Sequence, residues 1–360
     1  SGKTYRIREQ VKQLAEQNTE KIMLLVPEQY SFESEKAMLK LLGPKQVNKV
    51  QVMSFTRLTD MAFRAYGGSG IAKLDDGGRN IFMNLALEEV KEELEFYVTR
   101  VEELIPFMLS MSAELKMCAI APAVLLETAQ KTEDKKLKQK LKEVGLILSA
   151  YDALVAQSYL DPLDDLQRLK YTFTEHRFFG GYHIYIDSFE GFTQQEFDLI
   201  ELMLSQASEV TVSLSCDTLD NQIGAEVFAR VRHTANVLMR MARQHHVQVS
   251  APIVPESGIR FATEDLKHLE HQIFRVEKEP LSNVPDAITL YSGETVYHEA
   301  AYIGATIRHL VMNEGYQYQD FAIIARSLDH YRGILDVTLE QYEVPYFMDT
   351  PRSVYAEPLM

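Results

Sequence analysis

The sequence predicts an α/β protein with two lobes, each a parallel sheet flanked by helices, and a helical insertion within the first lobe. Three observations predict this class. Short apolar segments alternate with helical segments over residues 1–58 and again over 183–244. A second alternating unit begins near Pro285. The residues between the first two stretches, 79–170, show long charged and apolar periodic segments and no convincing strand. Alternation of strand and helix is typical of parallel sheets.

The first lobe opens with a helix directly after Ser-Gly-Lys-Thr at residues 1–4. Apolar residues then recur at helical spacing, namely Ile7, Val11, Leu14 and Ala15. The pattern continues with a strand at 22–26, a loop at 27–29, a helix at about 32–42 and a second strand at 50–53. This order of elements predicts the beginning of a parallel sheet.

Turn-forming glycines at 67–70 and 75–78 end that pattern. We expect a helical insertion over 76–170, which includes a solvated, lysine-rich run at 131–142. The sheet resumes with a strand at 183–187 and a helix that starts at a capping box, Thr193 with Glu196. Buried positions on that helix, a strand at 209–214 and a helix at about 225–244 complete the first lobe, which we assign to residues 1–75 and 171–284.

The second lobe is assigned to residues 285–360. Apolar segments predict strands at 287–291, 320–325 and 344–347, and helices lie between them at about 300–311 and 328–341. The pattern stops without a closing strand, and the chain starts inside a motif, so we expect both ends to be truncations.

Length and composition restrict the class of protein. A chain of 360 residues, 46% hydrophobic, is too long for one ordinary core and suggests two or three domains. The absence of an 18-residue apolar run and of a basic-then-apolar leader predicts a cytoplasmic protein without a membrane span. Cys118 and Cys216 have neither metal-ligand nor disulfide-framework spacing. A net charge of −15 argues against a free-standing, high-affinity DNA binder, so any DNA contact needs a local basic groove or a partner.

The opening tetrapeptide Ser1-Gly2-Lys3-Thr4 has the form of the second half of a phosphate-binding loop. In such a loop, backbone N–H groups and the helix N-terminus hold the phosphates of a nucleotide. Lys3 is expected to reach the β- and γ-phosphates, and Thr4 to place its hydroxyl on Mg²⁺. The glycine-rich first half is not present, but the helix and strand that follow favour a genuine loop over a chance tetrapeptide.

Asp187 ends the apolar strand Ile184-Tyr185-Ile186. A carboxylate at the end of a strand is what a second Mg²⁺-coordinating motif requires, although a strand-terminal Asp that caps a turn is also common. In helicases the next residue is normally a Glu that orients the attacking water. Here it is Ser188, and Glu190 lies two residues further on. The pattern therefore favours nucleotide binding and puts hydrolysis in doubt.

Two further groups are weaker candidates. Ser54, Phe55 and Arg57, directly after the second strand, could hold a phosphate and stack on a base of single-stranded DNA. On the residues alone, a core position for Phe55 and a surface charge at Arg57 are favoured instead. Arg326 follows a predicted strand of the second lobe, where an arginine could face the γ-phosphate across a cleft.

Several stretches together resemble the N-terminal half of the AddB subunits of bacterial AddAB helicase–nucleases. They are SGKT at 1–4, LLVPEQYSFESEKAML at 24–39, VQVMSFTRL at 50–58, HIYIDSFEGFTQQEFDLIE at 183–201, and DFAIIARSLDHYRGIL through VPYFMD at 320–349. The resemblance covers nearly the whole chain, with 79–170 the least diagnostic part.

The resemblance implies a superfamily 1 helicase-like fold: a P-loop RecA-like lobe with a helical insertion, then a truncated second RecA-like lobe. It implies ATP and Mg²⁺ as ligands and an AddA-like helicase/nuclease partner. It also implies contact with single- and double-stranded DNA, in the repair of double-strand breaks. By position, Lys3, Thr4, Asp187 and Arg326 match nucleotide-site residues, and residues 54–58 match a motif that touches single-stranded DNA. The family's nuclease domain and its iron–sulfur cluster belong to a C-terminal part that this chain lacks.

Two alternatives remain open. One is a scaffold derived from a helicase fold that clamps DNA and its partner without nucleotide. The other is an unrelated P-loop kinase for a small metabolite. The kinase would explain SGKT and Asp187, but neither the second lobe nor the scarcity of arginine at 120–170.

Overall fold

The computed structural model describes residues 2–17, 19, 21–68, 70–97, 101–216, 219, 226–254, 261–275 and 277–348. The chain forms two compact units. Unit 1 comprises Ser1–Ala262 with Glu270–Lys278, and unit 2 comprises Thr263–Leu269 with Glu279–Met360. The helix α11 (Glu264–Gln272) crosses the boundary between them.

Unit 1 is built on a four-stranded parallel sheet with the strand order β2-β1-β3-β4. The strands are β1 (Ile22–Leu25), β2 (Val50–Met53), β3 (His183–Ile186) and β4 (Glu209–Val212). All four residues of β1 are buried, as expected for a central strand of a parallel sheet covered on both faces. Leu25 pairs with both Met53 and Ile186, so the carboxyl ends of the strands lie level.

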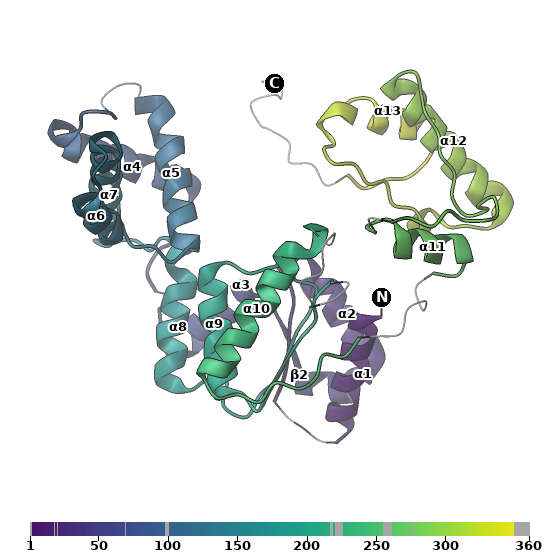
Figure 1. The fold of residues 1–360 in the computed structure, drawn as a ribbon, viewed down its shortest axis with the longest axis horizontal. Helices are drawn as coiled ribbons and strands as arrows, with labels where there is room; N and C mark the ends of the chain where they lie inside the picture. Colours follow the sequence, from purple (N-terminus) through teal and green to yellow (C-terminus); the bar gives the residue numbers. More distant parts are fainter. Residues whose placement is uncertain are drawn as a thin grey trace. The chain divides into compact units, whose positions relative to one another are not determined.

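Helices cover both faces of the sheet (Figure 1). On one face lie α1 (Lys3–Glu16) and α2 (Glu28–Gln46), and on the other lie α3 (Phe55–Tyr66), α8 (Asp165–His176) and α9 (Gln194–Gln206). The alternation of side chains decides which residues meet which helices. Leu24 and Tyr185 pack with α1, whereas Met23, Ile184 and Ile186 pack with the opposite layer. A further helix, α10 (Ala229–Gln244), packs outside α9.

The residues between α3 and α8 form a separate helical layer with its own core. It consists of α4 (Asp76–Val90), α5 (Val101–Met117), α6 (Pro122–Lys131) and α7 (Lys135–Val155). The buried side chains Met83, Met108, Ile147 and Tyr151 occupy its centre. The observed helical content agrees with the insertion expected from the absence of a strand pattern there.

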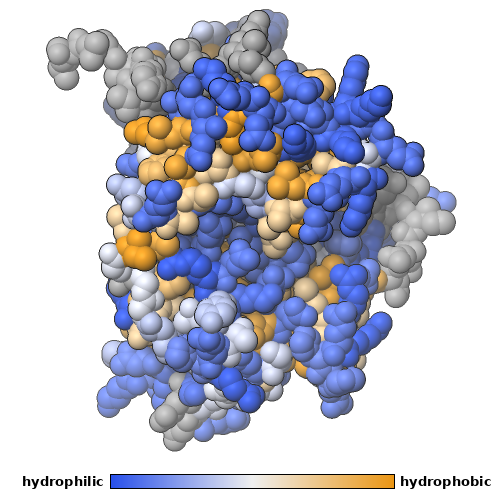
Figure 2. Space-filling view, turned by 90° about the vertical axis from the view of Figure 1, so that its left-hand side faces the viewer, coloured by the Kyte–Doolittle hydropathy of each residue, from blue (hydrophilic) through white to orange (hydrophobic). Residues whose placement is uncertain are grey.

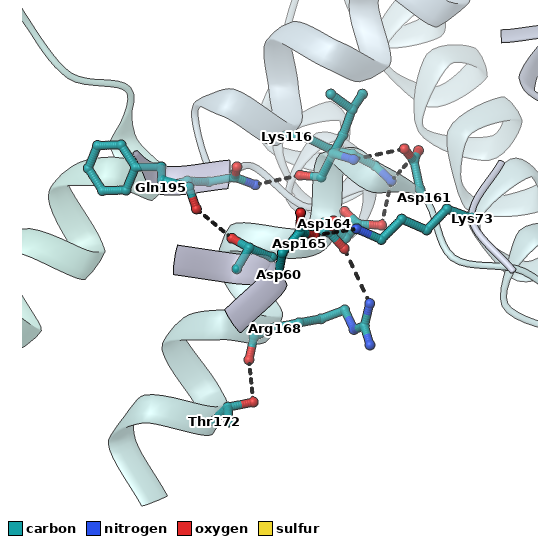
Figure 3. A network of polar contacts seen from close by, with 12 residues as sticks. Asp60, Lys73, Lys116, Asp161, Asp164, Asp165, Arg168, Thr172 and Gln195 are labelled. Atoms are coloured by element: carbon teal, nitrogen blue, oxygen red, sulfur yellow. Dashed lines mark hydrogen bonds and ion pairs between the residues drawn. The ribbon is translucent and has the colours of Figure 1, made fainter. Parts of the chain in front are cut away.

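A network of ion pairs joins this helical layer to the sheet layer (Figure 3). The Lys116 ammonium lies 2.7 Å from Asp164, 3.0 Å from Asp161 and 3.2 Å from Asp152. Burial by itself lowers the pKa of Lys116, but these three carboxylates raise it above its ordinary value. Asp161 is almost fully buried, and the ion pair with Lys116 compensates the loss of hydration of its negative charge.

The same junction holds the two connecting segments together. Ala72 and Leu74 exchange backbone hydrogen bonds of 3.0 Å with Leu160. Lys73 lies 2.6 Å from Asp165, whose other carboxylate oxygen is 3.3 Å from Arg168 (Figure 3). The two chain segments that lead into and out of the helical layer are therefore held side by side.

Unit 2 contains α12 (Val296–Glu314) and α13 (Leu335–Gln341), with short 3-10 turns at Tyr318–Asp320 and Asp329–Tyr331. Ala300, Ile307, Leu335, Leu339 and Val344 form its core. The helices approach closely at Gly304, where a Cβ atom would come within 2.7 Å of the Tyr342 ring.

The strands predicted at 287–291, 320–325 and 344–347 were wrong, since the described residues there form no strand. An extended segment becomes a strand only when a neighbour pairs with its N–H and C=O groups. Within the described residues these segments have no such neighbour, and Leu290, Ile324 and Phe347 are more than nine-tenths exposed. The alternation of apolar residues indicated extended segments, but it does not show whether a neighbouring strand is present to pair with them.

In unit 1, the predicted capping box of Thr193 and Glu196 is confirmed. The loop predicted at 27–29 was wrong, because α2 already begins at Glu28, directly after Pro27. Proline fixes its own φ near the value needed at a helix start, which the sequence interpretation overlooked. Among the described residues, no single helix is long and apolar enough to cross a membrane, and only the sharply bent pair Glu103–Met117 and Pro122–Lys131 passes that test jointly.

Candidate functional site

The carboxyl edge of the sheet gathers a polar side chain after every strand. Glu28 follows β1, Ser54 follows β2, Asp187 follows β3 and Ser213 follows β4. The ladder continues to this edge, because Asp187 N–H donates to Leu25 C=O at 3.0 Å and Ser213 N–H donates to Ile186 C=O at 2.9 Å. The chain order reverses between β1 and β3, and in open α/β sheets ligands bind at such a switch point.

Asp187 is buried, and its carboxylate accepts a hydrogen bond from the Ser213 hydroxyl. The register pairs Tyr185 with Thr211, so Asp187 and Ser213 extend the same face of neighbouring strands. Tyr185 packs in the cluster that contains α1. Because side chains alternate along a strand, Asp187 lies on the face of the sheet that α1 covers.

The first turn of α1 lies at this same edge. The helix precedes β1 and packs on it through Ile7 and Val11, so it runs opposite to the strand and starts at the carboxyl end. Gly2 caps it in a left-handed conformation, φ 96°, and no side chain caps its free N–H groups. Such a helix start attracts anions. Lys3 and Thr4 are half-buried there, whereas Ser1 lies outside the described residues.

The block after β2 is held by carboxylates. The Ser54 hydroxyl donates to Glu28 and accepts from the N–H of Arg57 at 3.1 Å, which caps α3. The Arg57 guanidinium lies 2.5 Å from Glu35. Phe55 is buried with its ring edge-on to Phe189, as the core interpretation had it. The DNA contacts of Ser54, Phe55 and Arg57 stay a prediction.

The residues after Asp187 leave the edge. Ser188 is exposed and has φ 67°, a left-handed conformation that L-residues other than Asn, Asp and Gly rarely adopt. Glu190 is also exposed. Neither forms part of the buried edge that Asp187 and Ser213 make, and the catalytic role predicted for Glu190 stays a prediction.

Arg326 is an exposed residue of unit 2 and follows a segment that is not a strand. Its predicted approach to Lys3 and Asp187 stays a prediction. In the part of the chain that the structure describes, no group of three or more His, Cys, Asp or Glu side chains is arranged to hold a metal ion. The predicted ligands, the Asp187 carboxylate and the Thr4 hydroxyl, are of the kind that Mg²⁺ uses, since this ion usually keeps waters and substrate phosphates as its other ligands.

Sequence reasoning missed two residues of this edge, Glu28 and Ser213. Each follows an observed strand by one to three residues, Glu28 after β1 and Ser213 after β4. Glu28 stands in a segment that was interpreted as a loop, and Ser213 in one that was interpreted as part of a longer strand.

Comparisons with known proteins identify the family of this chain. The family model described as ADDB, N-terminal, matches residues 1–270. The chain is 29% identical, over 98% of its length, to an ATP-dependent helicase/deoxyribonuclease subunit of Clostridium kluyveri (strain NBRC 12016). It is 28% identical, over its whole length, to the subunits of the same name from Thermoanaerobacter sp. (strain X514) and Clostridioides difficile (strain 630). The chain covers 32% of each of these relatives. Because the family model matches residues 1–270 of the 360-residue chain, this chain belongs to the ADDB N-terminal family.

Proposed function

We propose that this chain is the ATP- and DNA-binding N-terminal part of an AddB-like helicase/deoxyribonuclease subunit that processes double-strand DNA breaks for recombinational repair. One observation carries the proposal. The first turn of α1 and the buried carboxylate of Asp187 lie at the same edge and on the same face of a parallel sheet, at its switch point. The relatives' name, an ATP-dependent helicase/deoxyribonuclease subunit, supports the choice of nucleotide and polymer.

At this edge the N–H groups of α1 receive the phosphates of ATP, and the Lys3 ammonium neutralises their charge. The Thr4 hydroxyl and the Asp187 carboxylate would hold Mg²⁺, which would supply positive charge to offset that of the phosphates. Ser213 orients the Asp187 carboxylate through its hydrogen bond.

The proposal includes weak or absent ATP hydrolysis by this subunit. The position that normally carries the water-orienting Glu is Ser188, whose left-handed backbone aims its side chain differently from a residue in an extended continuation of β3. Glu190 is exposed and two residues further along. An AddA-like partner supplies the driving motor in the cytoplasm, and the nuclease with its iron–sulfur cluster lies in the remaining two-thirds of the subunit.

DNA contact at this edge involves Ser54 and Arg57, which start α3. Arg57 is engaged with Glu35 and Glu28, so a DNA phosphate has to compete with two carboxylates for it. The proposal therefore predicts weak DNA binding by the subunit without its partner.

The experiment is calorimetric titration of ATP–Mg²⁺ into the full-length protein, beside Lys3→Ala and a matched control, Lys12→Ala, on the same helix. We expect binding that Lys3→Ala weakens at least tenfold and Lys12→Ala leaves within twofold. ATP hydrolysis is then followed with and without single-stranded DNA. No heat of binding in the wild type would favour the nucleotide-independent scaffold, and strong DNA-stimulated hydrolysis by the isolated subunit would contradict the proposed weak or absent hydrolysis.

A further inference from the structure

The helical layer contains a hollow of about 660 Å³, away from the sheet edge. It lies between α6, the beginning of α7 and the segment at 95–96. Its floor is apolar, formed by Leu126, Ala129 and Leu146, and Phe96 stands beside it with 44% of its surface exposed. Figure 2 views the face that carries the helical layer and shows apolar patches directly bordering hydrophilic side chains.

The other side of the hollow is positively charged. Lys135, Lys136, Lys138 and Lys142 line it, and Glu95 is the one carboxylate among its lining residues. Within the described parts of the chain, no carboxylate lies within ion-pair distance of these four lysines. Residues 131–142 contain six lysines against Glu133 and Asp134, in a chain of net charge −15. A concentration of unpaired positive charge in an acidic protein selects for an anionic ligand.

The lysines are spaced to follow a polymer. Lys135, Lys138 and Lys142 lie three and four residues apart, so they share one face of α7 at intervals of roughly one turn, about 5 Å. A small anion needs one such group, whereas a row of them along a helix matches successive phosphates of a nucleic acid strand.

The backbone that carries the Phe96 ring is held by a buried carboxylate. Glu143 is fully buried, and its carboxylate accepts hydrogen bonds from the backbone N–H groups of Glu95, Phe96 and Tyr97 at 2.9–3.2 Å. The Gln139 amide donates a further bond at 2.8 Å. Lys140 lies 5.9 Å from the centre of the Phe96 ring. The backbone at Phe96 is therefore anchored beside the lysines by a buried carboxylate on the same helix that carries them.

We propose that this hollow binds single-stranded DNA, with bases against Phe96 and the apolar floor and phosphates on the lysines of α7. Stacking on an aromatic ring within a basic groove is how proteins bind single strands without sequence preference. The bases of a duplex are paired and cannot enter such a hollow, and an acidic protein partner would use the lysines but not the ring. The choice of DNA rests on the proposed function, but the site is separate from the edge that contains Ser54 and Arg57.

The test is fluorescence anisotropy with a labelled oligo(dT) of 20 nucleotides and the 360-residue chain, from 50 to 200 mM salt. Phe96→Ala is expected to weaken binding about 5- to 150-fold, since stacking is worth ~1–3 kcal/mol per base. Phe96→Tyr keeps the stacking face and is expected to stay within about threefold. The triple variant Lys135→Glu, Lys138→Glu, Lys142→Glu is expected to lower the salt slope by about 2, at roughly 0.7 per phosphate contact.

A matched control carries the same charge change elsewhere: Lys12→Glu, Lys40→Glu and Lys45→Glu on α1 and α2. We expect it to bind within about twofold of the wild type. Melting curves of all variants establish that they are folded. Loss in both triple variants alike, or no loss with Phe96→Ala, would overturn the inference.

Two further arms separate this inference from the function on which it rests. If the wild type binds oligo(dT) and Arg57→Ala weakens it while the Phe96 and lysine variants do not, the hollow is not the site but the proposed DNA-binding function stands. If the wild type does not bind at 50 mM salt, both fail. If polyglutamate displaces oligo(dT) at equal charge and Phe96→Ala has no effect, the hollow receives an acidic protein and not DNA.

Discussion

Replacing Lys116 with methionine tests the junction between the helical layer and the sheet layer. Methionine keeps most of the side-chain volume and removes the ammonium. Among the described residues, Asp161, 1% exposed, then keeps only the Leu163 N–H at 3.0 Å and a long contact of 3.4 Å to the Tyr151 hydroxyl. Leaving a buried charge without its partner costs about 3–5 kcal/mol. The Asp152 and Asp164 side chains are themselves more than a third exposed, so their pairs with Lys116 add at most about 1 kcal/mol each.

The assay is urea denaturation followed by circular dichroism at pH 7, which yields the free energy of unfolding. The control is Lys91→Met in the same layer, whose ion pair with Glu88 is more than half exposed on both sides. It is expected to change stability by less than about 0.5 kcal/mol. Adding Asp161→Asn to Lys116→Met removes the stranded charge and should recover more than about 1 kcal/mol. A loss below about 1 kcal/mol for Lys116→Met, or no recovery in the double variant, would refute the reasoning.

Three other predictions concern single positions. Burial raises the pKa of Glu143, but hydrogen bonds to its carboxylate outweigh this and lower the pKa below its ordinary value. The stability that these bonds contribute is present above the unfolded pKa of about 4.3 and is lost as pH falls through the folded pKa. Glu143→Gln should therefore cost about 1–3 kcal/mol at pH 7 and less in denaturation curves at pH 3. Gly304→Ala drives a Cβ into the Tyr342 ring and should destabilise unit 2 by about 1–3 kcal/mol, a loss that Tyr342→Leu in the same chain should reduce in thermal melts. Ser188→Gly relieves a left-handed backbone and should raise the unfolding free energy by about 0.5–1 kcal/mol, whereas equal or lower stability would show that Ser188 is not strained there.

The sheet of unit 1 was predictable because its signals are local. Apolar runs bounded by turn residues located all four strands to within two residues, as at Ile22–Leu25 and His183–Ile186. Two polar residues at strand ends, Ser54 and Asp187, were singled out from the sequence, since parallel strands bring their carboxyl ends to one edge. Glu28 was missed because Pro27 was interpreted as part of a loop and not as the residue before a helix.

Unit 2 was less predictable because strand formation depends on partners that local sequence does not reveal. The segment at 320–325 has an apolar pattern suited to a strand, yet Ile324 is exposed and, among the described residues, pairs with no strand. The lysine-rich hollow was missed for a similar reason. The run at 131–142 was interpreted as a solvated helix face, and only the fold brings Phe96 and α6 beside it.

The central claim is that Lys3 and Asp187 act at one nucleotide site, and a double-mutant cycle tests it most directly. The dissociation constant of ATP–Mg²⁺ is measured for full-length wild type, Lys3→Ala, Asp187→Asn and the double variant. Residues that hold the same phosphate–metal unit are coupled, so the double variant should lose at least about 1 kcal/mol less than the sum of the single losses. Strictly additive losses, or an ATP affinity that neither substitution changes, would contradict the claim.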